Sequence, residues 1–256
     1  MSTGAITPYI DVAQVTLYAF WVFFAGLIYY LLRENKREGY PLESDRSGSI
    51  DVQGWPAVPE PKTYKLQHGG TVNAPSGKRS AQPLAAEPSG SWGGAPLLPT
   101  GNPMLDGVGP GAWADRADVA DMTFEGLPKI VPLRVDGSYS VSSRDPDPRG
   151  MPVMGADGVV GGTVVDLWVD RSDILFRYLE LDVPVGQAQR RVLLPVNFCR
   201  IGERHVTVKS ILGAQFAQVP GTRHAEQVTF LEEEKIMAYY GGGTLYATPQ
   251  RQEPWL

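Results

Sequence analysis

Cysteine, histidine and excess positive charge are all scarce in this sequence of 256 residues. The single cysteine, Cys199, cannot form an intrachain disulfide, which agrees with a reducing compartment. Its neighbours indicate no nucleophile, so we expect a small buried core residue. The histidines His68, His205 and His224 lie far apart and lack metal-ligand spacing. The formal net charge of −5 argues against nucleic acid as a partner, because phosphate binding needs clustered Lys and Arg.

The common catalytic motifs are missing as well. The sequence contains no G-x-S-x-G, no P-loop and no Cys–His pairing. The run GVGPGA at residues 107–112 is rich in glycine, but no predicted strand precedes it and Pro110 would break a helix. We interpret this run as a rigid turn rather than a phosphate loop. The sequence therefore indicates no enzyme active site.

One long apolar run is present, from Val12 to Leu32, and it carries no charge over 21 residues. A helix of that length spans about 30 Å, the thickness of a hydrocarbon core. A cleaved signal peptide has its basic residues before the run, whereas here they follow it, at Arg33, Lys36 and Arg37. We therefore predict a retained transmembrane helix over residues 12–32. Because basic residues favour the cytoplasmic side, residues 1–11 are expected in the periplasm and the remainder in the cytoplasm.

The predicted span is rich in aromatic residues and has Gly26 near its middle. Aromatic filler facing lipid is one explanation, and packing against partner helices is the other, which we favour. The residues expected to make that packing are Tyr18, Trp21, Phe24 and Gly26. At the headgroup level we expect contacts with anionic lipid, although simple snorkelling is an equal alternative. The residues concerned are Tyr30, Arg33, Lys36 and Arg37.

Residues 33–113 form a Pro/Gly-rich arm, in which the stretch from Pro41 to Pro110 holds 11 of the 22 prolines. Neither a helix nor a central strand suits this composition. Large apolar residues are nevertheless spaced along the arm, so we expect it to lie extended against its own domain or a partner. They are Trp55, Tyr64, Leu66, Trp92, Leu97, Leu98, Met104 and Trp113.

Residues 114–256 are predicted to form a β-rich domain, a small antiparallel barrel or curled sheet. In GTVVDLWVD, alternate residues point to opposite faces. ILFRYLELDV is a second strand, RRVLLPVNFCRI a third that can break at Pro195, and GERHVTVKSI follows a tight turn. Near the end, Thr229 and Glu232 have capping-box spacing and residues 241–243 are glycines. We expect one helix of three or four turns that the glycines stop.

Carboxylates are the only remaining candidates for chemistry. The run VDRSD places Asp170 and Asp173 on either side of a predicted two-residue turn, where aspartate commonly bonds to backbone N–H groups. The alternative is a cluster of acids that exchange protons, joined by Glu180 and Asp182 of the next strand. Arg177 could tune such a group by favouring its charged form.

Several motifs together resemble the H subunit of the purple-bacterial photosynthetic reaction centre. They are FWVFFAGLIYYLLRENKREGYPLE, PTGNPMLDGVGPGAW, TVVDLWVD, LLP followed by a strand, and LEEEKIMAYYGGGTLYA. They cover nearly the whole chain in order. The resemblance implies one transmembrane helix, a cytoplasmic domain of the PRC-barrel type and a C-terminal helix.

The resemblance also implies a function within a complex of the bacterial inner, intracytoplasmic membrane. The H subunit binds no pigment itself and is no enzyme. It caps the L and M subunits, which hold bacteriochlorophyll, bacteriopheophytin, quinones and a non-haem iron. It shields the quinone sites and helps deliver protons to the secondary quinone. Light-harvesting 1 polypeptides and a cytochrome subunit can belong to the same complex.

The resemblance assigns Asp170, Asp173 and Arg177 to the proton path near the quinone pocket. Family members can carry surface histidines that accept protons just before the equivalent of Lys129, where this chain has Glu125 and Leu127. An exposed glutamate does not titrate near physiological pH as histidine does. Our hypothesis is that Glu125 and Asp121 form a weaker carboxylate antenna.

Two rival functions remain open at this point. A membrane-tethered PRC-barrel adaptor outside photosynthesis would be expected to show a basic face, since such barrels also occur in RNA-processing factors. A tethered enzyme would need a nucleophile or a metal site. The acidic balance opposes the first, and the missing motifs oppose the second.

Overall fold

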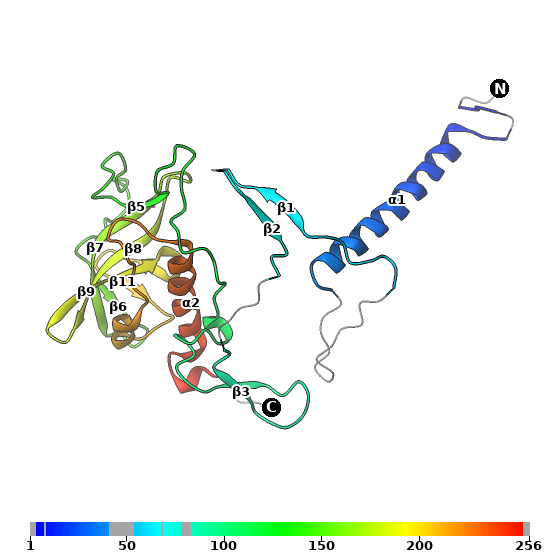
Figure 1. Cartoon of the computed structure of the whole chain (residues 1–256). Coiled ribbons are helices and arrows are strands. Elements are labelled where there is room, and N and C mark those ends of the chain that lie inside the picture. Colours follow the sequence, from blue (N-terminus) through cyan, green and yellow to red (C-terminus); the bar gives the residue numbers. More distant parts are fainter. Residues whose placement is uncertain (1–3, 8, 41–53, 68, 78–82, 253–256) are drawn as a thin grey trace. The chain divides into compact units, whose positions relative to one another are not determined.

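The computed structural model describes residues 4–7, 9–40, 54–67, 69–77 and 83–252. The chain divides into two compact units. The first unit comprises Met1–Ala81 and Ser91–Ala95, and the second comprises Gln82–Gly90 and Pro96–Leu256. Each unit is described by itself (Figure 1).

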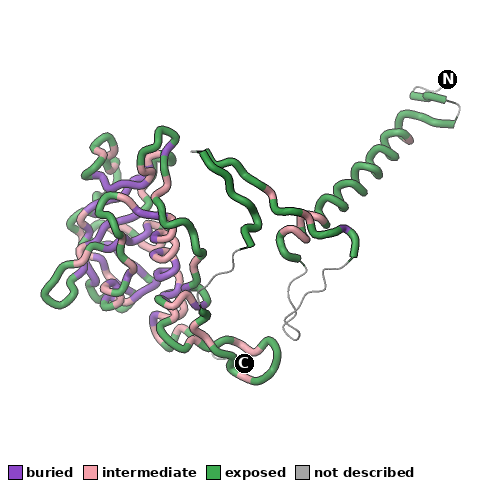
Figure 2. The backbone as a smooth tube through the Cα atoms, viewed as in Figure 1, coloured by how far each residue is buried: buried purple, intermediate pink, exposed green. Residues whose placement is uncertain are grey.

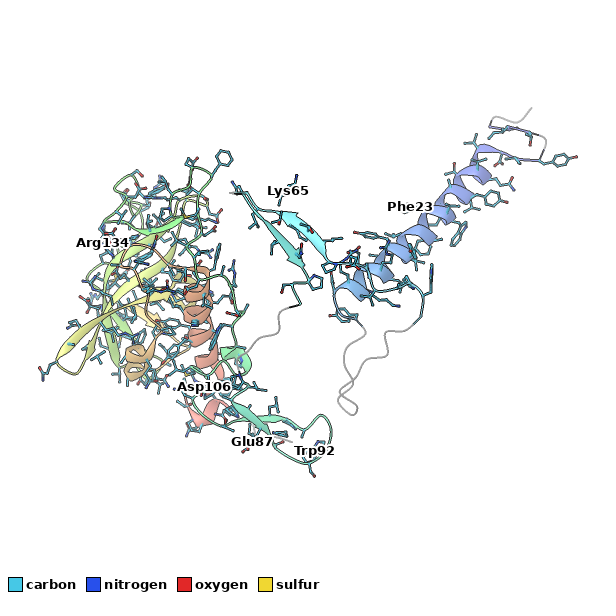
Figure 3. All side chains as sticks on the ribbon, viewed as in Figure 1. Phe23, Lys65, Glu87, Trp92, Asp106 and Arg134 are labelled. Atoms are coloured by element: carbon cyan, nitrogen blue, oxygen red, sulfur yellow. The ribbon has the colours of Figure 1, made fainter. Side chains whose placement is uncertain are left out.

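The first unit is built on the helix α1, Val12–Arg37. Asp11 caps its start by accepting a hydrogen bond from the Gln14 backbone N–H at 2.7 Å. Lys36 and Arg37 lie in the last turn, where cations complement the helix dipole. The helix is long and apolar enough to cross a membrane and has no buried residue, and its side chains, Phe23 among them, stand outward (Figure 3). It contains the predicted span and continues beyond it to Arg37.

The end of α1 binds the chain that follows it. Lys36 Nζ donates to the Gly54 carbonyl at 3.0 Å, and Arg37 Nε donates to the Glu60 carbonyl at 2.9 Å. The Trp55 ring stacks on Tyr29 with 4.9 Å between ring centroids. An antiparallel hairpin follows, made of β1, Lys62–Lys65, and β2, Thr71–Ala74. The last part of the juxtamembrane run, residues 41–43, lies outside the described residues.

The second unit contains a seven-stranded sheet in the order β10-β11-β6-β7-β8-β9, with β5 also paired to β7 (Figure 1). All its pairs are antiparallel except β6 with β11, which is parallel. The strands are β5 Ile130–Pro132, β6 Pro152–Met154, β7 Val160–Asp170, β8 Leu175–Val185, β9 Ala188–Pro195, β10 Cys199–Ile201 and β11 Val206–Val208. The predicted break at Pro195 is confirmed, because the short 3-10 helix η2, Val196–Phe198, separates β9 from β10.

The longest strands carry the core of this unit. Leu167, Trp168 and Val169 are all buried, so β7 is covered on both faces between its middle and its end (Figure 2). The expected alternation of β7 is interrupted by two shifts in register against β8. Asp170, the last residue of β7, is also buried, and it pairs with Ile130 of β5.

The C-terminal helix α2, Phe230–Tyr246, packs its buried Ile236, Tyr239 and Tyr240 into the same core. Its predicted capping box is confirmed, since the Thr229 side chain accepts from the Glu232 N–H and the Glu232 side chain accepts from the Thr229 N–H. The predicted stop at residues 241–243 is wrong, because α2 runs through all of them.

Close packing explains why glycines lie inside α2. A Cβ at Gly242 would lie 3.1 Å from the Gly111 Cα, and one at Gly243 would lie 2.4 Å from Ile211 Cγ2. Gly111 belongs to the 3-10 helix η1, Gly109–Gly111. The glycines therefore allow the arm and the core to approach the helix rather than end it.

The described part of the arm is neither wholly extended nor wholly packed. In the second unit, β3, Ala86–Pro88, pairs with β4, Leu97–Pro99. Trp92, in the connecting segment Ser91–Ala95 that is assigned to the first unit, is exposed and projects outward (Figure 3). Met104 and Val108 of the second unit are buried. The end of the arm thus orders against its own domain, while earlier apolar side chains stay exposed. Those are Trp55, Tyr64, Leu66, Trp92, Leu97 and Leu98.

The predicted fold class is confirmed. The chain has one long apolar helix near its N-terminus, a β-rich domain and a C-terminal helix. The remaining helices among the described residues are short 3-10 turns such as η3, Gly213–Gln218, and η4, Pro249–Arg251.

Candidate functional site

Lys129 lies at the centre of a group of aspartates in the second unit. Its backbone N–H donates to the Asp121 carbonyl at 2.8 Å, and its own carbonyl accepts from the Arg171 N–H at 2.9 Å. The next residue, Ile130, pairs with Asp170 in the β5–β7 register. These backbone bonds place Lys129 between the segment around Asp121 and the turn after β7.

The Lys129 ammonium contacts three carboxylates. Its Nζ lies 3.4 Å from Asp170 Oδ2, 3.6 Å from Asp173 Oδ2 and 3.8 Å from Asp121 Oδ2. Partial burial opposes its charge, but the charges of Asp170, Asp173 and Asp121 outweigh this and raise the pKa of Lys129. One cation among three acids leaves the group, which we call the acid cluster, with negative charge.

Asp170 stabilises the loop after β7 in addition to contacting the Lys129 ammonium. Its Oδ1 accepts hydrogen bonds from the backbone N–H groups of Ser172 and Asp173, at 3.0 and 3.1 Å, as a turn aspartate does. The predicted two-residue turn is wrong, because Asp170 pairs with Leu175 and residues 171–174 form the loop. Ile174 closes that loop with a positive φ of 54°, so β8 starts one residue later than expected.

A further acid, Glu233, lies close enough to the acid cluster for the charge of Asp121 to raise its pKa. The Tyr178 hydroxyl donates to Glu233 Oε2 at 2.6 Å, and Arg177 Nη2 lies 4.0 Å from the same oxygen. Burial raises the pKa of Glu233, and the charge of Asp121 raises it further, although Tyr178 and Arg177 oppose the shift. Arg177 is thus directed to Glu233 rather than to Asp170 or Asp173 among its described contacts.

Sequence reasoning did not single out Glu233 or Lys129. The capping box could have located Glu233 in the first turn of α2, but not its partner 55 residues earlier. A buried tyrosine hydroxyl needs a hydrogen-bond partner, and an acid one position after the box is a candidate. That signal was available for Glu233, whereas Lys129 had none.

Glu180 and Asp182 belong to a different ion-pair network. Glu180 bonds with Arg134, with Arg191 at 3.2 Å and with the Trp168 indole N–H at 3.0 Å. Arg191 also pairs with Asp182, and Arg134 pairs with Asp166 at 3.0 Å. Arg134 is marked in Figure 3. The structure therefore does not gather these two acids with Asp170 and Asp173 as the sequence hypothesis had them.

Glu125 lies in an exposed turn, and no described contact joins it to Lys129. Hydrogen bonds from its own backbone N–H and from Thr123 lower its pKa.

Of the residues expected at the membrane, Tyr18, Trp21 and Phe24 are exposed on α1, and Gly26 has no atom within 4 Å of an ideal Cβ. These four positions leave a surface free for other helices or lipid.

The headgroup residues are partly engaged within the first unit. The Arg33 guanidinium lies 5.7 Å from the Tyr29 ring centroid, and Lys62 Nζ lies 5.8 Å from the Tyr30 ring centroid. Lys36 and Arg37 bind the backbone carbonyls described above. Among the four predicted headgroup residues, Arg33 is therefore the cation whose guanidinium has no described hydrogen bond to the protein and can best bind a lipid headgroup.

No group of three His, Cys, Asp or Glu side chains suited to a metal ion occurs within the described ranges. The acid cluster can instead store charge and pass protons through water, because carboxylates close together exchange protons in short steps. Its side chains range from exposed to buried, with Asp173 at 55%, Asp121 at 36% and Asp170 at 1% relative exposure. The arrangement can thus connect water with the interior of the unit.

Two family models match the chain. The model of the photosynthetic reaction centre H-chain N-terminal region matches residues 4–135, and the PRC-barrel domain model matches residues 141–215. The first match contains α1, the arm and Lys129, and the second contains the sheet from β6 to β11 together with Asp170 and Asp173. The apolar helix and the H-chain match fit a membrane-anchored subunit, and the H-chain family is one of structural subunits rather than enzymes. The chain belongs to the H-chain family of the photosynthetic reaction centre.

Proposed function

We propose that this H chain caps the cytoplasmic face of the L and M subunits, shields their quinone sites and helps deliver protons to the secondary quinone. The observation that carries the proposal is the acid cluster of Asp121, Asp170 and Asp173 on Lys129. A quinone that takes two electrons must also take two protons, and carboxylates with water between them can supply these.

The exposure of the acid cluster supports a direction of transfer. Asp173 and Asp121 meet solvent, whereas Asp170 is nearly fully buried and holds its position through two backbone hydrogen bonds. Lys129 places its positive charge within 4 Å of all three carboxylates. Glu233, with its raised pKa, adds a group that holds its proton to higher pH than an ordinary glutamate.

Exposed apolar side chains next to the acid cluster support a protein partner on this surface. Met122, Phe124 and Leu127 come from a short hairpin held by the Met122–Pro128 bridge. Ile174 ends the loop after Asp170, and Leu175 begins β8. Phe124 is 83% exposed and Ile174 is 72% exposed. A group of exposed large apolar residues commonly marks a protein interface, and L and M would cover it.

Features of the first unit also support the proposed complex with L and M. The exposed aromatic side chains of α1 can pack against helices of L and M, and Arg33 can bind an anionic headgroup. The apolar residues of the arm would lie on the cytoplasmic face of the same partners. Pigments, quinones and iron would reside on L and M, and light-harvesting 1 polypeptides or a cytochrome subunit could surround them.

The decisive test is Asp170→Asn in the native complex. Asparagine keeps the oxygen that accepts the turn hydrogen bonds but removes the charge and the exchangeable proton. We expect slower proton uptake and slower second electron transfer to the secondary quinone, measured with flash excitation and a pH-indicator dye. Asp145→Asn, in an exposed loop, is the matched control. Equal rates in both variants would contradict a role for Asp170.

Proton entry is tested separately with Glu125→Gln. If Glu125 and Asp121 form an antenna, this variant slows proton uptake most at low buffer concentration. Unchanged quinone protonation at every pH would remove Glu125 from the path and leave Asp121 and Asp173 as entry points.

The complex itself is tested by a near-infrared absorption spectrum of the tagged chain, purified in mild detergent from its native membrane. Bacteriochlorophyll and bacteriopheophytin bands that bleach in light are expected. A colourless preparation, from cells that express their photosystem, would overturn the partnership with L and M. The chain would then be better explained as a tethered adaptor.

A further inference from the structure

A cavity of about 680 Å³ lies between the β10–β11 hairpin and the C-terminal part of α2. None of its lining residues belongs to the acid cluster or to the Arg134 network. They are Asn197, Phe198, Cys199, Arg200, Thr207, Lys209, Ser210, Thr244 and Arg251. Three of these are cations, and none is an acid.

The strand register explains why basic side chains gather there. Arg200 pairs with Thr207 across the hairpin, so both point to the same face. Their neighbours Val206 and Val208 are fully buried and fill the inner face. Lys209 follows Thr207 by two residues and so continues the outer face, where it reaches the cavity.

Arg251 comes to the cavity from η4. Its Nη1 donates to the carbonyls of Ser210 and Gly243 at 2.6 Å each, and its Nη2 donates to the Lys209 carbonyl at 2.9 Å. These bonds fix the guanidinium but leave part of its N–H fork free. Its described partners are neutral carbonyls, so none of them neutralises its positive charge.

The positive charge of the cavity is uncompensated among the described residues. No ion pair among the described residues includes Arg200, Lys209 or Arg251. Ten other Lys and Arg residues do form ion pairs. Hydroxyl groups accompany the cations at Thr207 and Thr244, and the Thr244 hydroxyl already donates to the Gly241 carbonyl at 2.6 Å, so Thr207 is the one of the two with no described acceptor. Ser210 lines the same cavity, and its buried Oγ has no hydrogen-bond partner in the part of the chain that the structure describes.

We propose that this cavity binds the phosphate group of an organic phosphate. Arginine forks and a lysine ammonium converging with hydroxyl donors are the groups that recognise a tetrahedral oxyanion. The volume exceeds that of phosphate alone, and Phe198 supplies an apolar wall for the rest of the molecule. A phospholipid headgroup and a free phosphate ester share this chemistry, and the experiment separates them.

The test uses the full chain in its native complex, purified in mild detergent. The double variant Arg200→Gln/Lys209→Gln removes two cavity charges and leaves the carbonyl contacts of Arg251 intact. The matched control, Arg144→Gln/Arg204→Gln, removes two exposed charges that line no described cavity and form no described ion pair. Calorimetric titration with inorganic phosphate and with glycerol 3-phosphate measures free-anion binding, and lipid-phosphorus analysis counts retained phospholipid.

We expect the cavity variant to lose about ten-fold or more in affinity for the phosphate ester, because charge-assisted hydrogen bonds are removed, while the control is unchanged. If instead only the retained lipid phosphorus falls in the cavity variant, the ligand is a phospholipid headgroup. Equal binding and equal lipid content in the two variants would overturn the proposal. Proton uptake is expected to be normal in the cavity variant, so this result stands apart from that of Asp170→Asn.

Discussion

Replacing Gly243 by alanine will destabilise the second unit, although alanine is the better helix former. In a helix interior, this change normally stabilises by about 1 kcal/mol. Here the added Cβ would lie 2.4 Å from Ile211 Cγ2 and 2.5 Å from the Ser210 carbonyl oxygen. Real Cβ atoms do not approach other atoms so closely, and α2, the core or the backbone of Ser210 must move.

The Ser210 carbonyl cannot move freely, because Arg251 Nη1 donates to it. Overpacking of a core costs roughly 1–3 kcal/mol, and a backbone obstacle places Gly243 at the upper end. After subtraction of the helix propensity gain, the net loss is about 2 kcal/mol. At Gly242 the nearest atom is 3.1 Å away, so a shift of a few tenths of an ångström suffices and alanine there is expected to be nearly neutral.

The free energies of unfolding can be compared by chemical denaturation of the full chain in detergent, followed by near-ultraviolet circular dichroism. Gly137→Ala is the control, because its Cβ meets no atom within 4 Å and the residue is exposed. Its expected effect is within about 0.5 kcal/mol of zero. The reasoning is refuted if Gly243→Ala equals or exceeds the wild type in stability.

Three further outcomes are expected. Tyr178→Phe removes the hydrogen bond to Glu233 and should lower the free energy of unfolding at neutral pH by roughly 1–2 kcal/mol in denaturant titrations. Because burial raises the pKa of Glu233 above 4.5, the folded state binds its proton more readily than the unfolded chain, so stability falls as pH rises between the two pKa values. Glu233→Gln should flatten that slope, and an unchanged slope would contradict it. Burial raises the pKa of the Cys199 thiol to about 11, so iodoacetamide should label it slowly at pH 8 until the protein is denatured.

Local patterns were sufficient to predict most elements of the fold. The apolar run, the alternating strands, the break at Pro195 and the capping box at Thr229 each depend on residues close together in the chain. The turn aspartate at Asp170 was also foreseeable, because its hydrogen bonds reach only the next few residues.

The glycines of α2 show where local reasoning fails. Glycine ends helices because it tolerates positive φ, but it also permits close packing, and sequence alone does not separate these uses. At residues 242 and 243 the deciding atoms belong to Gly111, Ile211 and Ser210, which come from other parts of the chain. The same limit applies to the acid cluster, where Lys129 and Asp170 meet only through the pairing of β5 with β7.

Net charge gave an incomplete guide to ligands for the same reason. The total of −5 describes the chain as a whole, and on that basis the sequence argues against nucleic acid as a partner. Binding of a small ion depends instead on the charges within a Debye length, about 8 Å at physiological ionic strength. On one domain, pairing of β5 with β7 gathers three aspartates around one lysine, while the β10–β11 hairpin and η4 gather three cations without an acid. Folding can therefore place a negatively charged group and a positively charged cavity on one acidic chain, as the proposed proton path and the proposed phosphate site each require.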